Sequence, residues 1–338
     1  MVGALAHRLS ARSRRGVPGL APVLVSALAV LLLVAGCSSD NSATLVDGVE
    51  ITTDDVARLH IDFDELDDDE RASSLLLLIL RQAFGSRATT DLDLQFDEGD
   101  FETALQERLN RLEGRGGVDE VLTALNQTPD RIRIEAELDT IRAGVVAELV
   151  RTEAPGFDLQ AAFDGYLLAE AEVCIRQMQL SSGPDFDRAA DRLAAGENFA
   201  DVAREISIDP FVDRTDGVGA GGDLGCSAPS ALPGGLDVAT LTAPLNEPTG
   251  PVVADNGLYL LEVYQRSAPD LAEVRDEVAE FAVAQQGPEL FRRWAVDVLQ
   301  LIDVEVAAEF GTWGMLPETD PVPTVVPAYR QDNIIGSE

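Results

Sequence analysis

Lysine is absent from this sequence of 338 residues, and histidine and cysteine are almost absent. The histidines are His7 and His60, and the cysteines are Cys37, Cys174 and Cys226. With so few histidines, neither a Ser-His-Asp triad nor a histidine metal cluster can be assembled, so the sequence predicts no serine hydrolase and no metal site. His60 alone is interpreted as an ordinary helix or surface residue.

Positive charge is also scarce. The chain has 60 acidic residues against 25 basic ones, a formal net charge of −35, and every basic residue is an arginine. Because nucleic-acid phosphates need cationic partners, this balance predicts no nucleic-acid binding. The acidity favours solubility and suits either basic clients or a saline habitat, and both interpretations stay open.

One long apolar run is present, at the N-terminus. Four arginines precede the run VPGLAPVLVSALAVLLLVAG, which ends at Cys37. This order is typical of an export signal, and LVAGC resembles the lipobox of bacterial lipoproteins. We expect a signal peptide over residues 1–36, a lipid on Cys37 and a tether over residues 37–44, so that the protein is extracytoplasmic and lipid-anchored to the cell membrane. A transmembrane anchor or an uncleaved signal is the alternative.

The two remaining cysteines, Cys174 and Cys226, form an even pair in a chain that is expected to be exported. An oxidising compartment permits a disulfide between them. Two buried free thiols are the alternative, and the sequence favours neither.

Residues 45–168 have a mostly helical pattern. Residues 43–59 predict two short strands with a turn at Asp47-Gly48, then a helix capped by Thr52 or Thr53. Apolar periodicity then predicts helices near residues 69–85, 100–114, 118–127 and 129–154.

The pattern changes near residue 173. Strands are expected over residues 173–180 and 257–266, with two short amphipathic helices over 185–196 and 198–207 between them. A helix over residues 270–302, with a break at Gly287-Pro288, and a closing strand within 303–314 follow. The tail, residues 315–338, is rich in proline and polar residues and is expected to be disordered.

Each helical flank therefore carries strand sequence at its far end. This arrangement suggests that residues 45–168 and 268–314 form one domain, into which an α+β unit of residues 169–267 is inserted.

The glycine-rich stretch DGVGAGGDLG, residues 216–225, satisfies G-x-G-x-x-G through Gly217, Gly219 and Gly222. A dinucleotide-binding turn needs a strand directly before these glycines and a helix directly after them. The flanking segments SIDPFVDRTD and DLGCSAPSALPGG fit neither requirement. The sequence therefore predicts no nucleotide binding.

The same stretch fits another family. FADVAREISIDPFVDRTDGVGAGGDLG, followed by PLNEPTGPVVADNGLYLLEVYQR, resembles the parvulin (PpiC, or rotamase) family of peptidyl-prolyl cis-trans isomerases over residues 173–267. The flanks look like those of exported SurA- and PrsA-type foldases. The resemblance implies an α+β fold: a parvulin-like domain, with a small antiparallel sheet and surrounding helices, inserted in a mostly helical chaperone domain.

The resemblance also implies site residues. The two family histidines fall on Gln177 and Tyr259, and the Cys or Asp of the turn falls on Asp209. The Met and Phe that hold the proline ring fall near Leu232 and Leu236. Such a site needs no cofactor, and its clients would be unfolded or proline-containing secreted polypeptides.

Three functions are consistent with this pattern. The first is a prolyl isomerase with a degenerate site, because both family histidines are replaced. The second is a catalytically inactive, peptide-binding chaperone of the same fold. The third is a structural spacer of the cell envelope.

Overall fold

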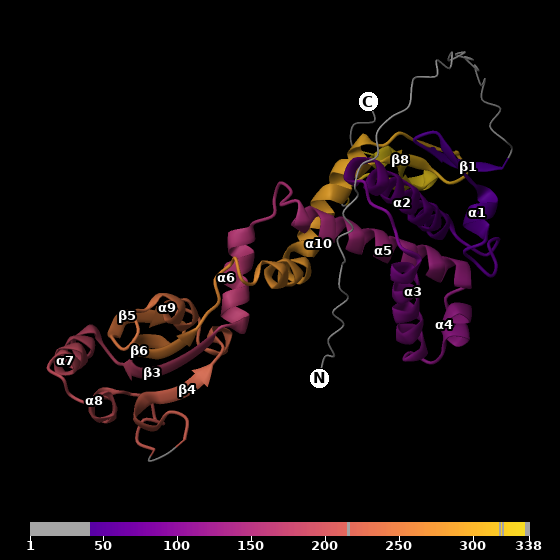
Figure 1. Cartoon of the computed structure of the whole chain (residues 1–338). Helices are drawn as coiled ribbons and strands as arrows, with labels where there is room; N and C mark the ends of the chain where they lie inside the picture. The colour runs from indigo at the N-terminus through magenta and orange to yellow at the C-terminus, as the bar shows by residue number, and fades with distance from the viewer. Residues whose placement is uncertain (1–40, 215–216, 318, 320, 335–338) are drawn as a thin grey trace, which may run out of the picture. The chain divides into compact units, whose positions relative to one another are not determined.

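The computed structural model describes residues 41–214, 217–317, 319 and 321–334 (Figure 1). The expected signal peptide, the expected lipid site Cys37 and the first part of the expected tether lie outside these ranges. Within them, no helix is both long enough and apolar enough to cross a membrane.

The described chain starts with a hairpin and a short helix. Strands β1 (Ser42–Val46) and β2 (Val49–Thr52) are joined at Asp47-Gly48, where both residues have positive φ. Helix α1 (Thr53–Ala57) begins with a capping box between Thr52 and Asp55. The expected tether over residues 37–44 is too long, because β1 begins at Ser42 and pairs with β2 from that residue.

Six longer helices make up the flanks. Four of them lie near their expected positions: α2 (Asp68–Leu92), α3 (Glu98–Glu113), α4 (Val118–Ala124) and α5 (Pro129–Arg151). α6 (Leu159–Glu170) follows them, and the second flank forms α10 (Arg275–Leu301). α5 begins with a proline, whose missing N–H is not needed in a first turn. α6 was not expected from the sequence. The signal was present, because Leu159, Ala162, Phe163 and Tyr166 recur at helical spacing and pack on the core of the flanks.

The two flanks share one sheet and one core. β1 pairs with β2 on one side and on the other with β7 (Val304–Val306), which comes more than 250 residues later. A single hydrophobic cluster contains buried residues from both flanks, among them Leu75, Ile79 and Val145 from the first and Val278 and Leu299 from the second. The chain between the flanks is therefore an insertion, as predicted.

The expected break at Gly287-Pro288 is wrong, because α10 continues through both residues. Gly287 is buried, and a Cβ built there would lie 2.8 Å from Val146 Cγ1, so the glycine allows α10 to approach α5 closely. Packing on either side of the proline holds the helix together despite the lost hydrogen bond.

The tail is ordered in its described part, which corrects the expected disorder over residues 315–338. Strand β8 (Thr312–Gly314) pairs with β9 (Thr324–Val326), and the 3₁₀ helix η3 (Ala328–Asn333) follows. Val325 and Val326 are buried. The composition resembles that of a disordered tail. Val322 and Val325 nevertheless pack against the core of the flanks, and this burial of apolar surface stabilises the short strand β9.

The inserted unit is built on a four-stranded antiparallel sheet of order β4-β3-β6-β5 (Figure 1). Its strands are β3 (Glu172–Leu180), β4 (Asp223–Ser227), β5 (Pro248–Ala254) and β6 (Gly257–Ser267). Helices α7 (Gly183–Ala194) and α8 (Phe199–Ile206) pack on one face around Met178 and Leu260.

The other face of this sheet is covered by α9 (Leu236–Thr242), which packs against Ile175, Leu261 and Val263. Two 3₁₀ turns, η1 (Ala220–Gly222) and η2 (Pro229–Ala231), flank β4. The mixed α+β class, with a small antiparallel sheet unit inserted between helical flanks, is confirmed.

Candidate functional site

Strand register brings Gln177 and Tyr259 to the same face of the inserted sheet. Gln177 pairs with Leu261, and Gln179 pairs with Tyr259. Because directly paired residues share a face and side chains alternate along a strand, all four side chains lie on one face. This is the face that carries α9.

Leu236 and Leu232 belong to the apolar cluster on this face. Leu236 is fully buried and Leu232 partly buried in the cluster that contains Tyr259. Leu236 is the first residue of α9, and Gly235 before it has φ +96° and would place a Cβ 2.5 Å from the carbonyl oxygen of Val253. Only glycine allows this close entry into α9, so it determines where Leu236 sits.

Asp209 reaches the site from the loop that follows α8. The hydroxyl of Ser207 bonds both the N–H and the C=O of Gln179, each at 3.2 Å, and Ile208 N–H donates to the same carbonyl at 2.8 Å. The loop is thus fixed to the end of β3. Asp209 Oδ1 accepts the N–H of Phe211 at 2.9 Å, which orients the carboxylate.

Tyr259 is a neutral hydrogen-bonding group in this setting. It is 2% exposed, and its hydroxyl donates to Asn256 Oδ1 at 3.0 Å. Burial, and more weakly the negative charge of Asp209, raise the pKa of Tyr259. The negative charge of Asp209 therefore lies within electrostatic range of Tyr259.

Gln177 has an unused hydrogen-bond acceptor. Its side chain is 8% exposed, and its Oε1 is buried without a partner among the described residues. An unsatisfied buried polar atom costs about 1–3 kcal/mol. A peptide-binding site would contain such an acceptor, because a bound peptide can donate a hydrogen bond to it. Gln177 lies on the same sheet face as Tyr259.

The glycines of the GGDLG stretch hold β4 against β3 beside Gln177. Gly222 has φ +85°, and a Cβ there would lie 2.3 Å from the carbonyl oxygen of Gln177. Gly221, at φ +60°, would place a Cβ 2.5 Å from that of Ala200 in α8. The stretch leads through η1 into β4 rather than from a strand into a helix, so its glycines serve close packing and form no nucleotide-binding turn.

Cys174 and Cys226 are directly opposite in the β3–β4 register and form a disulfide. Cys174 is buried and Cys226 is exposed. Glu172 lies close enough to both sulfurs for a metal-ligand group, but both thiols are consumed by the disulfide. These residues therefore link an edge strand to the centre of the sheet.

Sequence reasoning did not identify Asn256, which accepts the Tyr259 hydroxyl and also, through its backbone oxygen, Gln179 Nε2 at 2.8 Å. The signal was present. Asp255-Asn256-Gly257 joins β5 to β6, and Asn-Gly is a strong hairpin-turn signal directly before a strand.

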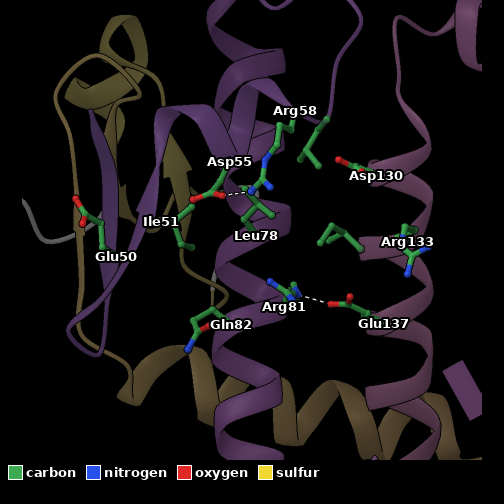
Figure 2. Close-up of a pocket in the computed structure, with 12 residues that line it drawn as sticks. Glu50, Ile51, Asp55, Arg58, Leu78, Arg81, Gln82, Asp130, Arg133 and Glu137 are labelled. Atoms are coloured by element: carbon green, nitrogen blue, oxygen red, sulfur yellow. Dashed lines mark hydrogen bonds and ion pairs between the residues drawn. The ribbon is translucent and has the colours of Figure 1, made fainter. Parts of the chain in front are cut away.

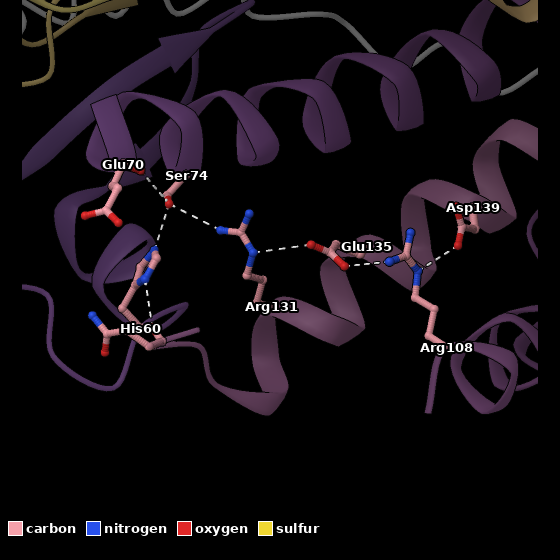
Figure 3. Close-up of polar contacts among 8 residues, drawn as sticks. His60, Glu70, Ser74, Arg108, Arg131, Glu135 and Asp139 are labelled. Atoms are coloured by element: carbon pink, nitrogen blue, oxygen red, sulfur yellow. Dashed lines mark hydrogen bonds and ion pairs between the residues drawn. The ribbon is translucent and has the colours of Figure 1, made fainter. Parts of the chain in front are cut away.

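His60 lies outside this site and belongs to a polar network of the first flank (Figure 3). Its Nε2 is 2.7 Å from Ser74 Oγ in α2, and its Nδ1 is 3.1 Å from the carbonyl oxygen of Asn126. Arg131 Nη1 donates to the same Ser74 oxygen at 3.3 Å. The side chain therefore joins the segment after α1 to α2 and to the loop between α4 and α5, which is more than the ordinary surface role expected.

The network continues through ion pairs. Arg131 pairs with Glu135 at 3.3 Å, Glu135 pairs with Arg108 of α3 at 2.5 Å, and Arg108 bonds Asp139 at 2.7 Å (Figure 3). All four side chains are at least partly exposed, so each pair contributes little by itself. Together they orient α3 along α5.

Comparison with known proteins gives the following relatives. No protein-family model matches the chain. The foldase protein PrsA of Halalkalibacterium halodurans is 22% identical over 317 residues, which cover 89% of each chain. The periplasmic chaperone PpiD of Haemophilus influenzae is 27% identical over 106 residues, 31% of this chain and 16% of that protein.

Solved structures give matches of the same type. A PrsA peptidylprolyl isomerase from Bacillus cereus matches 77% of this chain and 91% of its own, at 14% identity and a TM-score of 0.47. A PpiC-type peptidyl-prolyl cis-trans isomerase domain matches 30% of this chain and 97% of its own, at 21% identity and a TM-score of 0.26. The resemblance to PrsA- and SurA-type foldases with a parvulin-type domain is confirmed by the sequence similarity to PrsA along 89% of the chain.

Proposed function

We propose that the protein is an extracytoplasmic foldase of the parvulin peptidyl-prolyl isomerase type, which acts on proline-containing segments of secreted polypeptides. We further propose that it is held at the membrane by a lipid on Cys37 and that residues 169–267 form its catalytic domain. The similarity to PrsA along 89% of the chain supports the general class.

One observation carries the assignment of the site. The buried Oε1 of Gln177 has no partner, and it lies on the sheet face that also holds Tyr259 and the Leu236 cluster. A purely structural residue at this position would be expected to satisfy its amide internally. A bound peptide would supply the missing donor once the Gln177 side chain turns toward it, because Oε1 is inaccessible in the unliganded chain.

The chemistry required is modest. Amide resonance sets a barrier of about 18–20 kcal/mol to rotation about the peptide bond, and an enzyme lowers it by favouring the twisted amide over the planar one. Leu232, which is partly exposed, would contact the proline ring, and the fully buried Leu236 would support it from behind. Gln177 and the neutral Tyr259 hydroxyl would hydrogen-bond the peptide, and Asp209 would keep the Tyr259 proton in place.

A catalytically inactive chaperone is the second candidate. Both positions that carry imidazole in the family carry other groups here, and the Tyr259 hydroxyl already donates to Asn256. The site then has fewer free donors for the transition state, whereas peptide binding needs only the apolar face. Suppressed aggregation of an unfolded client without faster isomerisation would identify this function.

The test is the cis/trans exchange rate of a short X-Pro peptide, measured by NMR with the full chain. We expect the full chain to accelerate the exchange. Asp209→Ala or Gln177→Met should reduce this acceleration at least tenfold, and Asp213→Ala should leave it as in the parent chain. A tenfold loss corresponds to about 1.4 kcal/mol of transition-state stabilisation. Asp213 is an exposed carboxylate of the same loop, so its variant controls for the change in charge.

Two results would contradict the proposal. If high concentrations of the full chain leave the exchange rate unchanged, the enzyme proposal is overturned. If exchange is accelerated but the three variants behave alike, the activity does not come from this sheet face.

A further inference from the structure

A groove runs between α2 and α5 in the first flank, and none of the residues that line it belongs to the inserted sheet. It consists of two hollows of about 300 Å³ and about 460 Å³. Arg81, Gln82 and Glu137 line both hollows. Figure 2 shows Arg81 of α2 and Glu137 of α5 reaching toward each other, and they form an ion pair. The two hollows are therefore one groove, called here the α2–α5 groove, crossed by one ion pair.

Apolar side chains line the α2–α5 groove at both ends. Leu78 and Ile134 line the first hollow, and Ile141 and Phe101 line the second. Phe96 forms part of the second hollow and is 39% exposed. An exposed aromatic side chain on the wall of a concave site is a feature of binding surfaces rather than of a finished core.

The rim of the groove is acidic. Six carboxylates and three guanidinium groups line the two hollows. The guanidinium groups are engaged: Arg58 and Arg81 form ion pairs, and Arg133 lies 5.5 Å from the centre of the Phe101 ring. Arg133 keeps its positive charge in this contact, but six carboxylates against three guanidinium groups still leave the rim with a net negative charge.

Three of the rim carboxylates, Asp97, Glu98 and Asp130, have no ion-pair partner among the described residues. All three lie at the start of α3 or α5, where a negative charge stabilises the helix. That role accounts for their presence at these positions. It does not neutralise their charge, which remains available to a ligand in the groove.

We propose that the α2–α5 groove binds extended, unfolded polypeptide segments in which apolar residues alternate with arginine or lysine. The inference rests on the proposed foldase function, because it names the segments that such a protein would hold. It concerns a surface separate from the isomerase face.

The dimensions of the groove agree with this occupant. Along α5 it reaches from Asp130 to Ile141, about 16 Å at 1.5 Å per residue. An extended segment covers that length with about five residues, and alternate side chains point the same way. Apolar side chains would enter the two hollows while basic ones meet the rim. Gln82, whose amide has no bond to a described residue, would pair with the peptide backbone between the hollows.

The experiment uses the full chain and a short, fluorescent, proline-free peptide in which leucine and arginine alternate, with a counterpart that has glutamate in place of arginine. Without proline, the probe does not depend on isomerase chemistry. Binding is measured by fluorescence anisotropy. We expect the arginine peptide to bind and the glutamate peptide to bind at least tenfold more weakly.

Two pairs of variants test the groove. Ser86→Trp fills the second hollow and should weaken binding at least tenfold, while Thr90→Trp, one turn further along α2, should not. The double variant Glu98→Arg, Asp130→Arg should weaken binding of the arginine peptide at least fivefold. The double variant Glu102→Arg, Asp119→Arg changes the net charge equally outside the groove and should have no such effect. All four charged positions are exposed, so these variants keep the fold.

Several results would overturn the proposal. These are equal binding of the two peptides, equal binding by the groove variants and their controls, or loss of a dimer on Ser86→Trp in light scattering, which would make a second copy the occupant. Isomerase activity without peptide binding would reject the groove alone, and binding without activity would reject the catalytic function alone.

Discussion

At the scale of single residues, replacing imidazole by an amide and a phenol changes what the sheet face can do. Gln177 does not titrate, and burial raises the pKa of Tyr259 further from neutrality. Neither side chain therefore changes charge near pH 7. Any activity at this site should depend on pH less than it would with two histidines.

His60 is the titratable side chain of the first flank whose protonation matters near neutral pH. Burial lowers its pKa from 6.5, as does the positive charge of Arg131, while the bond to Asn126 and the charge of Glu70 act in the opposite direction. The folded chain therefore takes up this proton at a lower pH than the unfolded chain does.

This shift predicts how stability depends on pH. Between about 6.5 and the lower pKa of folded His60, only the unfolded chain binds the proton, so the free energy of unfolding falls as pH falls through this interval. Above it the contribution is complete. We expect melting temperatures from pH 7.5 to 5, measured by circular dichroism, to fall more steeply for the parent than for His60→Gln. Parallel curves would show that His60 is not the source.

At the scale of elements, the pairing of β4 with β3 depends on glycine. Gly222 and Gly225 both have positive φ, but a Cβ at Gly222 meets the backbone of Gln177 at 2.3 Å whereas one at Gly225 meets nothing within 4 Å. The two positions thus separate backbone conformation from steric approach.

This difference predicts how much an alanine at each position destabilises the protein. Gly225→Ala should destabilise by about 1 kcal/mol, the cost of a left-handed residue, and Gly222→Ala by at least about 2 kcal/mol more, because strand pairing must also shift. Free energies of unfolding from urea denaturation measure both. Equal losses would mean that β4 is not held as closely to β3 as the geometry requires.

At the scale of the whole molecule, negative charge dominates. With 60 acidic residues against 25 basic ones, self-repulsion opposes the compact state. The ion pairs do not remove this effect, because most of them are exposed, and exposed pairs contribute about 0–1 kcal/mol each.

Salt should therefore stabilise the protein. Raising ionic strength from about 0.01 M to 1 M shortens the screening length from about 30 Å to 3 Å, which weakens the repulsion more than it weakens the few arginine pairs. We expect the melting temperature to rise with sodium chloride and to rise equally with potassium chloride. A fall would mean that ion pairs outweigh the repulsion.

Local chemistry was enough to predict much of this protein. The turn at Asp47-Gly48, the helix cap at Thr52, the strands on either side of the insertion and the foldase resemblance all follow from short-range patterns of residues. The helical spacing of α6 was present in the sequence but was missed, whereas local patterns failed at Pro288 and in the tail. There, burial against distant segments such as α5 outweighs propensity and composition.

Tertiary structure alone decided the rest. No sequence pattern shows that Oε1 of Gln177 lacks a partner or that Cys174 faces Cys226 across two strands, because each depends on register between segments far apart in the chain. The sequence determines which groups can form hydrogen bonds or be buried. Only packing decides which of them are left for a ligand.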